Sequence, residues 1–274
     1  PYRALLDRVI EGQAELIARW LLIGFIHGVM NTDNMAVSGE TIDYGPCAFM
    51  DAYDPATVFS AIDQHGRYAY GNQPRIAQWN LARFAEALLP LLAEDQEAAI
   101  ADAQESLGVF ADLFQRSYQA GLRRKIGLVT VRDGDDAFLS ALLEAMAVNQ
   151  VDFTLFFRRL GDVAGGAAEE GLRALFVDPT ACDAWLAQWR ARLALEDGEA
   201  ADRAAAMHRV NPAYIPRNHQ VEAVIRAAVD REDFAPFHAL LAALAEPFVD
   251  QPHLAHYAEP PQADERVLQT FCGT

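Results

Sequence analysis

The chain has 274 residues, of which 52% are hydrophobic, so it can form a core and lacks the composition of a disordered protein. Its length suits one large domain or two small ones. Lys and Arg number 22 against 39 Asp and Glu, giving a formal net charge of −17. A chain this negative repels nucleic acid and anionic membranes, so we expect neither as a partner.

Membrane-spanning and disulfide-rich proteins are also disfavoured. No run of 18 apolar residues is present, so no membrane-spanning helix is expected. The three cysteines, Cys47, Cys182 and Cys272, have the spacing of neither a metal site nor a disulfide framework. This is typical of a reducing compartment and favours a cytoplasmic location. We expect Cys182 to lie in the core.

Apolar residues recur at steps of three and four through most of the chain, which predicts a mainly α-helical fold. A first helix is expected over residues 3–26, then a loop with short strands over 27–45 and an ordered, irregular segment over 46–75. Further helices are expected over residues 76–90, 94–120, 138–148, 153–160, 179–195, 218–229 and 234–248, followed by an irregular tail.

A glycine-rich segment at residues 161–166 is the best candidate for an internal hinge. We therefore predict a first domain at residues 1–160, which holds the polar loops described below. Residues 161–274 would form a helical C-terminal extension and tail.

The most informative segment is H-G-V-M-N-T-D-N at residues 27–34, followed by I-D-Y-G-P at residues 42–46. It places the carboxylates of Asp33 and Asp43 and the carboxamide of Asn34 within 11 residues, between apolar runs. Mg²⁺ takes hard oxygen ligands, and proteins usually hold it with one or two carboxylates plus substrate phosphates. The segment predicts a Mg²⁺-nucleotide site with Asn34 and Asp43 as ligands, which would also suit Mn²⁺.

Protein kinases have a comparable order, with H-R-D-L-x-x-x-N followed by D-F-G. His27 and Asn34 have the same spacing, and the D-Y-G at residues 43–45 stands where D-F-G would. The position two after His27 is Val29, which cannot accept a proton, so the nearest candidate for the general base is Asp33.

Each of these residues also has an ordinary structural explanation. Asp33 could cap a loop turn, and Asp43 could precede a simple Tyr-Gly-Pro turn. His27 is expected to brace the metal turn through backbone hydrogen bonds, and Asn31 to orient Asp33. Arg67 could clamp a phosphate oxygen, because guanidinium pairs with planar acceptors, or could pair with a nearby Asp in a packed loop.

These motifs, together with G-R-Y-A-Y-G-N-Q-P from residue 66 and W-N-L from residue 79, resemble the selenoprotein O family. Further matches lie within residues 152–160 and 211–218, and the resemblance runs from about residue 20 to the end of the chain. It implies a protein-kinase-like fold. It also implies transfer of AMP, rather than phosphate, from ATP to protein hydroxyls.

The resemblance assigns roles to individual residues. Asp33 would activate a Ser, Thr or Tyr hydroxyl, with the metal held by Asn34 and Asp43. Arg67, Tyr44 and Gly45 would belong to the region that contacts nucleotide phosphate or substrate. The family's eukaryotic members have selenocysteine near the C-terminus, where this chain has Cys272. We hypothesise a reversible disulfide between Cys47 and Cys272 that ties the tail to the active-site loop.

The only lysine, Lys125, follows the polar loop, whereas the phosphate-binding lysine of a kinase precedes it. No glycine-rich phosphate loop precedes residue 27 either. We therefore expect this chain to be the kinase-like C-lobe and helical extension of a longer protein. The missing N-lobe would be its partner, and the chain alone should be inactive.

Two other functions stay open on the residues alone. One is a kinase that transfers the γ-phosphoryl group of ATP. The other is a non-catalytic pseudokinase scaffold that binds nucleotide, an interpretation that the loss of the usual base at Val29 supports.

Overall fold

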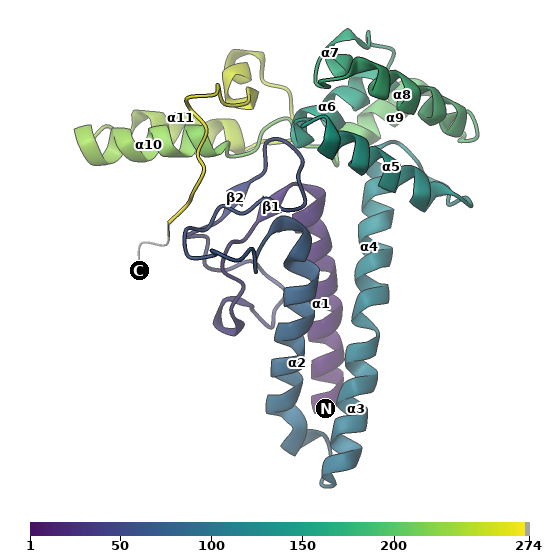
Figure 1. Ribbon diagram of the computed structural model, residues 1–274, viewed down its shortest axis with the longest axis vertical. Helices are drawn as coiled ribbons and strands as arrows, with labels where there is room; N and C mark the ends of the chain where they lie inside the picture. The colour runs from purple at the N-terminus through teal and green to yellow at the C-terminus, as the bar shows by residue number, and fades with distance from the viewer. Residues whose placement is uncertain (272–274) are drawn as a thin grey trace. The chain divides into compact units, whose positions relative to one another are not determined.

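The computed structural model describes residues 1–271 and is mainly α-helical, as the sequence predicts (Figure 1). Cys272 lies outside the described residues. Within them are two strands of two residues each, β1 (Phe25–Ile26) and β2 (Ala48–Phe49), and three 3-10 helices, η1 (Thr32–Asn34), η2 (Tyr70–Asn72) and η3 (Pro252–Ala258). The eleven α-helices in this part of the chain are α1 (Tyr2–Leu22), α2 (Gln73–Leu92), α3 (Gln96–Gly108), α4 (Phe110–Lys125), α5 (Asp135–Val148), α6 (Phe153–Ala164), α7 (Glu170–Arg173), α8 (Pro179–Leu193), α9 (Ala200–His208), α10 (Asn218–Arg231) and α11 (Ala235–Leu244).

The chain divides into two compact units. The first contains residues 1–47 and 55–121 with the end of the tail from Gln269, and the second contains residues 48–54 and 122–268. No helix among the described residues is both long and apolar enough to cross a membrane.

In the first unit, α1, α2 and α3 pack against one another and lie side by side (Figure 1). The buried residues of α1 recur every three or four positions, so that they share one face of the helix. They include Leu6, Ile10 and Ile17, each fully buried. Burying a side chain of this size stabilises the fold by about 1.5–3 kcal/mol, so this face fixes the helix that precedes the polar loop.

Several helix boundaries differ from those that the sequence predicts. The helix expected over residues 3–26 ends at Leu22, and Phe25–Ile26 form strand β1. The helix expected over residues 234–248 ends at Leu244. The expected helix over residues 94–120 is two helices, α3 and α4, which meet at Val109. The helix expected to stop at Pro90 continues to Leu92 with the exposed proline inside its last turn, where the lost hydrogen bond costs least. The helix expected to end at residue 160 continues to Ala164. Gly161 is thus a packed helical position, since a Cβ there would lie 2.6 Å from His208.

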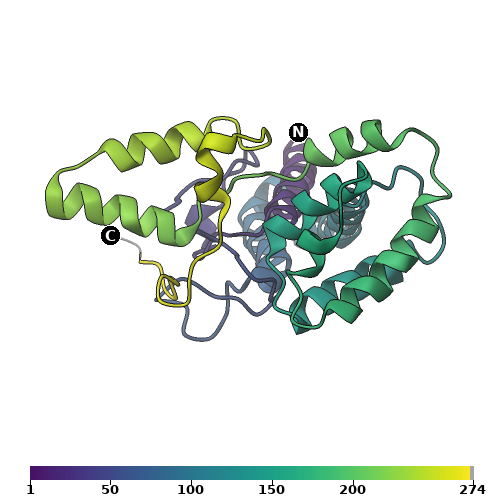
Figure 2. The ribbon, with the colours of Figure 1, turned by 90° about the horizontal axis from the view of Figure 1, so that it is seen from above.

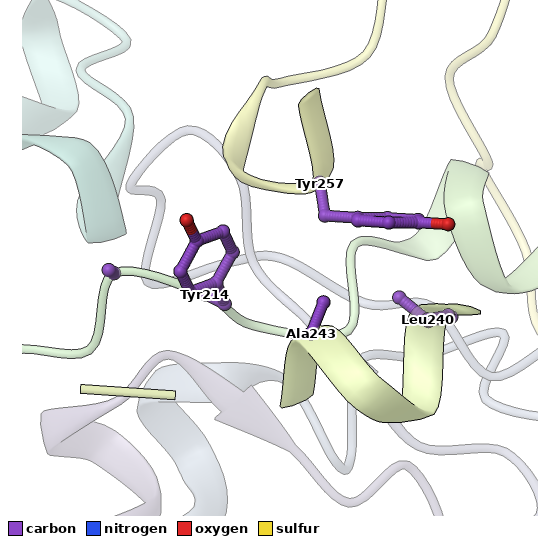
Figure 3. Close-up of a cluster of buried hydrophobic side chains, with 5 residues drawn as sticks. Tyr214, Leu240, Ala243 and Tyr257 are labelled. Carbon is purple, nitrogen blue, oxygen red and sulfur yellow. The ribbon is translucent and has the colours of Figure 1, made fainter. Parts of the chain in front are cut away.

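In the second unit, α10 and α11 run side by side, as both ribbon views show (Figures 1 and 2). A small apolar cluster lies where the segment before α10, the second half of α11 and η3 meet (Figure 3). Tyr214 and Tyr257 pack there beside Leu240 and Ala243. The hydroxyl of Tyr214 also donates to the carbonyl of Gln251 at 2.9 Å, so its polar end is satisfied.

The most buried cation of the second unit is Arg217, whose side chain is 0% exposed. Its Nη1 lies 2.6 Å from Asp51 Oδ1 and 2.7 Å from Asp152 Oδ2, and its Nη2 donates to the carbonyl of Ala258 at 3.0 Å. Asp152 is also the N-cap of α6, because its Oδ1 accepts from the backbone N–H of Leu155 at 2.8 Å. One guanidinium therefore holds three separate segments of this unit.

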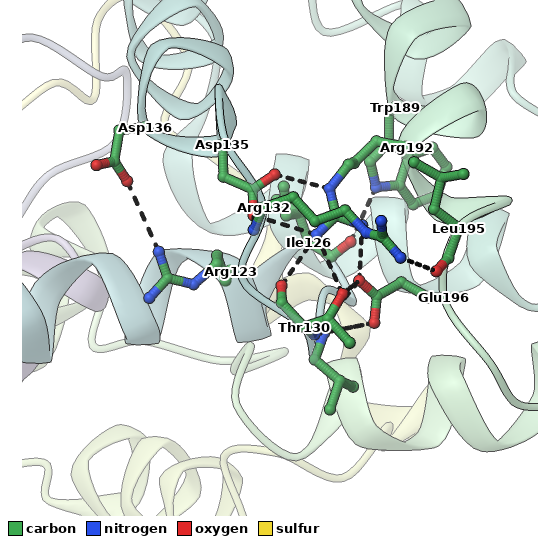
Figure 4. A network of polar contacts seen from close by, with 11 residues as sticks. Arg123, Ile126, Thr130, Arg132, Asp135, Asp136, Trp189, Arg192, Leu195 and Glu196 are labelled. Atoms are coloured by element: carbon green, nitrogen blue, oxygen red, sulfur yellow. Dashed lines mark hydrogen bonds and ion pairs between the residues drawn. The ribbon is translucent and has the colours of Figure 1, made fainter.

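A second polar network joins the start of α5 to the end of α8 (Figure 4). Arg192 Nε donates to Asp135 Oδ1 at 2.7 Å and its Nη1 to Glu196 Oε1 at 2.6 Å. Burial raises the pKa of Glu196, but hydrogen bonds from Thr130 and Arg192 outweigh it and hold that pKa at about 2. The ionised carboxylate is therefore strongly preferred in the folded state.

Replacing Glu196 with glutamine should remove an acid-sensitive part of the stability. Because the folded pKa of about 2 lies below the unfolded value of 4.5, this carboxylate stabilises the fold fully above pH 4.5. That contribution, on the order of 2–3 kcal/mol, is lost as the pH falls from 4.5 towards 2. Urea unfolding of both proteins between pH 7 and pH 3 should show a difference that shrinks with acid; a difference that is constant with pH would contradict the assignment.

The single lysine is buried in the second unit, where its ammonium lies 4.2 Å from the ring centroid of Phe157 and 5.2 Å from that of Phe153. Burial lowers the pKa of Lys125 to about 7. No carboxylate within residues 1–271 forms an ion pair with it. Lys125 is thus an aromatic-packed core residue.

Replacing Lys125 with methionine should stabilise the protein most at neutral and lower pH. The folded pKa of about 7 lies below the unfolded value of 10.5, so burying this amine destabilises the fold fully below pH 7 and less as the pH rises towards 10.5. We expect an increase in the free energy of unfolding on the order of 3 kcal/mol at pH 7, decreasing at pH 9. Lys125→Ala, which leaves a cavity, serves as the comparison, and equal stability of the methionine variant and wild type at pH 6–7 would contradict the account.

Candidate functional site

The predicted site residues lie in the first unit, in the loop between α1 and the segment that leads to α2. Two side chains of α1 hold this loop. Gln13 Nε2 donates to the carbonyl of Ala36 at 2.7 Å, and Trp20 Nε1 donates to Thr41 Oγ1 at 2.9 Å. The loop is therefore attached to the helix on both sides of its tip.

His27 braces the turn that precedes Asp43, as the sequence predicts. Its Nε2 lies 2.8 Å from the carbonyl oxygen of Ile42, and its Nδ1 accepts from the backbone N–H of Val29 at 3.4 Å. This pairing requires the neutral ring with the proton on Nε2. Burial lowers the pKa of His27, which favours the same neutral form.

Two buried side-chain amides of α2 hold the backbone of the segment that leads from α1 into the loop. Gln73 accepts from the N–H of His27 at 3.0 Å and donates to the carbonyl of Phe25 at 3.0 Å. Asn80 Nδ2 donates to the carbonyl of Met30 at 2.9 Å. Gln73 and Asn80 are seven residues apart, so they lie on one face of the helix. That face fixes residues 25–30 through their main chain.

The structure brings the two predicted metal ligands to neighbouring positions. Met35 and Thr41 form an antiparallel bridge, which closes the loop tip. Asn34 lies one residue before this bridge and Asp43 two residues after it, so the two flank the same end of a narrow hairpin-like loop. Asn34 Nδ2 donates to the carbonyl of Val29 at 3.0 Å, which fixes its amide and leaves Oδ1 as the atom that would bind a metal.

The backbone at Asp43 has φ of 53°, in the left-handed region. This conformation is strained for most residues but tolerated by Asp and Asn. Strain of this kind concentrates at functional sites, where the surrounding contacts impose it. Here the preceding residue, Ile42, is bonded to His27, and Asp43 is exposed.

Gly28 is required next to the site. Its φ is +86°, and a Cβ at this position would lie 2.8 Å from the carbonyl oxygen of Pro46. Any larger residue would push the first half of the loop away from the D-Y-G-P turn.

The donor set fits a nucleotide-bound divalent cation. No three His, Cys, Asp or Glu side chains within the described part of the chain gather as a metal-binding group. The amide oxygen of Asn34 and the carboxylate of Asp43 are hard oxygen donors, a set that Mg²⁺ completes with phosphate oxygens and water.

The proposed base, Asp33, is exposed in η1, next to Asn34. Asn31 does not contact it by any hydrogen bond between described residues. Instead, Asn31 Oδ1 accepts from the Tyr68 hydroxyl at 2.5 Å, which attaches the loop to the segment before α2. Whether Asn31 orients Asp33 stays a prediction, since no hydrogen bond joins the two side chains among residues 1–271.

The other predicted site residues, Tyr44, Gly45 and Arg67, are exposed. Tyr44 is 60% exposed, with its ring 6.4 Å from that of Phe25, and Gly45 is exposed beside it. The guanidinium of Arg67 lies 4.8 Å from the ring centroid of Trp79 and has no carboxylate partner among residues 1–271. The alternative in which Arg67 pairs with an Asp is therefore wrong: Asp63 accepts from the backbone N–H of Arg67 at 2.8 Å.

Two cysteines are described as free thiols, the half-buried Cys47 and the fully buried Cys182. The expectation that Cys182 lies in the core is confirmed. Burial raises the pKa of the Cys47 thiol to about 11, and the charge of Asp43 adds to this shift. Near the chain end, the Thr270 hydroxyl donates to the carbonyl of Pro46, the residue before Cys47, at 2.5 Å.

The sequence pattern did not identify the residues that hold the loop, above all Gln13, Trp20 and Asn80. Gln13 and Asn80 are polar residues on otherwise apolar helix faces, 2% and 5% exposed. That pattern is the signal that could have identified them, because buried amides need hydrogen-bond partners.

The comparisons with known proteins identify the family of the chain. The family model described as "Protein adenylyltransferase SelO" matches residues 1–245. Proteins named "Protein nucleotidyltransferase YdiU" from Bradyrhizobium diazoefficiens and Rhodopseudomonas palustris are 64% and 63% identical over the whole chain. One from Methylorubrum populi is 62% identical over 281 aligned residues. The chain spans 56% of the length of each of these relatives. These matches show that the chain belongs to the SelO family of protein adenylyltransferases.

Proposed function

We propose that the full-length protein transfers AMP from Mg²⁺-ATP to Ser, Thr or Tyr hydroxyls of other proteins. The observation that supports this best is the loop closed by the Met35–Thr41 bridge, which has Asn34 on one side and a strained, exposed Asp43 on the other. The matched relatives are named nucleotidyltransferases, which favours attack at the α-phosphorus.

In this mechanism the acceptor hydroxyl oxygen attacks the α-phosphorus of ATP, and its proton passes to the carboxylate of Asp33. The bond between the α-phosphorus and the bridging oxygen breaks, and pyrophosphate leaves. Asn34 Oδ1 and the Asp43 carboxylate would hold Mg²⁺, which neutralises phosphate charge when bound. Reactions of this class depend mostly on positioning and charge stabilisation, so the rigid support of the loop by His27 is part of catalysis.

We further propose that these loops form part of a kinase-like C-lobe over residues 1–160, with residues 161–274 as a helical extension. The mainly helical fold and the order of catalytic loop, D-Y-G turn and irregular segment support this. The part of the relatives that this chain does not span would supply the N-lobe contacts to ATP, and the chain alone should then transfer no AMP.

Intact-mass spectrometry tests the proposal. The full-length protein is incubated with Mg²⁺-ATP and a generic acceptor protein, and the acceptor is weighed. A gain equal to AMP supports adenylyl transfer. A gain equal to phosphate would make the protein a kinase with a displaced base, and unchanged mass with nucleotide still bound would make it a pseudokinase scaffold.

The pairing of Cys47 with Cys272 stays a proposal, since Cys272 lies outside the described residues. Its support is the Thr270 anchor: Thr270 forms a parallel bridge with Ser60 and bonds to Pro46. Because the pKa of Cys47 is raised to about 11, only a very small fraction is thiolate at neutral pH, so oxidation should be slow. Equal thiol counts and equal electrophoretic mobility with and without reductant would exclude the disulfide.

A further inference from the structure

The exposed side of α2 in the first unit has a cluster of arginines around a tryptophan. Arg75, Trp79 and Arg83 follow one another at steps of four residues, so they share one helix face. Arg67 reaches this face from the preceding segment. We call these four residues, Arg67, Arg75, Trp79 and Arg83, the arginine–tryptophan face.

Two guanidinium groups of this face stack on one exposed indole. The Arg67 guanidinium lies 4.8 Å and that of Arg83 5.3 Å from the Trp79 ring centroid, while Trp79 is 42% exposed. Each guanidinium is attracted to the ring, but the two positive charges repel each other, and a bound anion would reduce that repulsion. The stacking also fixes the direction of both guanidinium groups, which lowers the entropy cost of binding a carboxylate.

Carboxylates within the described part of the chain neutralise only one arginine of this face. Arg83 Nη2 pairs with Glu86 at 2.6 Å, and Glu86 is the only acidic residue of α2. Neither Arg67 nor Arg75 has a carboxylate partner among residues 1–271. The nearby carboxylate of Asp63 is occupied by the backbone N–H groups of Arg67 and Tyr68, at 2.8 Å and 2.7 Å.

This positive face is unusual on a chain with a net charge of −17. An acidic ligand is repelled by most of such a surface and attracted here, which concentrates its binding on one place. The face is also joined to the catalytic loop. Tyr68, next to Arg67, donates to Asn31 at 2.5 Å, and Asn31 lies two residues before the proposed base Asp33.

We propose that the arginine–tryptophan face docks an acidic segment of the protein substrate, with Asp or Glu side chains placed near the hydroxyl that receives AMP. That this segment belongs to the protein substrate rests on the proposed function, whereas the binding of an acidic peptide to the face does not. Arg67 and Arg75 would pair with the carboxylates, and the indole of Trp79 would pack against the peptide. Arg67 is then a residue of substrate specificity.

A binding experiment tests the face without any turnover. Two fluorescein-labelled peptides contain one Thr, flanked by Glu in the first and by Gln at the same positions in the second. Fluorescence anisotropy with the full-length protein should show the Glu peptide binding about tenfold more tightly. Arg67→Glu should abolish this preference, and a Lys-flanked peptide should then bind more tightly than to wild type. The matched control is Arg19→Glu, because Arg19 is an exposed arginine of α1 in the same unit, paired with Glu15 at 3.4 Å.

Equal binding of the Glu and Gln peptides to wild type would overturn the proposal. So would an equal loss of preference in Arg19→Glu, because it would show a response to net charge alone. A folded Arg67→Glu protein, checked by circular dichroism, that keeps the full preference would also overturn it. If Arg67→Glu does not fold, Arg75→Glu is measured in its place under the same criteria.

AMP transfer to the same two peptides separates this inference from the proposed function. With wild type, the Glu peptide should have the lower KM and a similar kcat, since the face acts in binding. Transfer with equal KM values would overturn the docking proposal and leave the function standing. No AMP transfer to any acceptor, with the anisotropy preference intact, would overturn the function and leave the peptide-binding site standing.

Discussion

Replacing Asp43 with asparagine is expected to lower AMP transfer by the full-length protein about a thousandfold or more. Asparagine tolerates the left-handed φ of 53° and has nearly the same shape, so the turn held by His27 should persist. What is lost is the negative charge that would hold Mg²⁺ with Asn34. The measurement is the initial rate of acceptor labelling from ATP labelled at the α-phosphate.

The control is Asp133→Asn, which removes an exposed carboxylate from the loop before α5 in the other unit. This variant should keep the wild-type rate, and both variants should match wild type in thermal midpoint. An Asp43→Asn protein that retains more than about a tenth of the Mg²⁺-dependent rate would exclude Asp43 as an essential ligand. Asp43→Ala would add backbone strain of about 1 kcal/mol, so asparagine is the cleaner test.

Replacing Arg217 with methionine is expected to destabilise the second unit by about 3–5 kcal/mol. The substitution leaves Asp51 and Asp152 facing each other without the guanidinium that neutralises them. It also removes the donor to the carbonyl of Ala258. Burial raises the pKa of Asp51 even beside Arg217, so without this cation Asp51 should bind a proton more readily still.

Urea unfolding followed by circular dichroism measures this effect. The control is Arg226→Ala on α10, since Arg226 is 69% exposed and pairs with Glu222 one turn away. Exposed pairs of this kind contribute about 0.3–0.5 kcal/mol, so this variant should be close to wild type. If Arg217→Met lowers the free energy of unfolding by less than about 1 kcal/mol, the prediction is wrong. The attraction within the buried ion pairs would then only just offset the cost of removing their charges from water.

The sequence predicted the helices whose apolar stripe is long and regular, such as α1, together with the candidate loop. The period of the apolar residues indicates which face of a helix is buried, but not where the helix is interrupted. The break at Val109 between α3 and α4 was therefore missed. So was α9, whose nine residues include only alanines and one methionine as apolar positions. Short helices of this kind are stabilised by packing, here against α6, which no local pattern encodes.

The candidate site was only partly predictable. The types and spacing of Asp33, Asn34 and Asp43 indicate chemistry, because few residues supply hard oxygens. The loop is held, however, by side chains far along the chain: Gln73 bonds the backbone of His27, 46 residues away, and Asn80 bonds that of Met30, 50 residues away. A single sequence does not reveal such contacts, since each amide could have bonded elsewhere.

The burial of Lys125 against two phenylalanine rings gives this chain one shielded amine. Amine-directed reagents such as N-hydroxysuccinimide esters need a neutral, accessible ε-amino group. In the folded protein the ε-amino group of Lys125 is buried, so the reagent cannot reach it. The rate at which the peptide containing Lys125 becomes acylated therefore measures how often the second unit opens to solvent. That one position would report transient opening under native conditions, without denaturant.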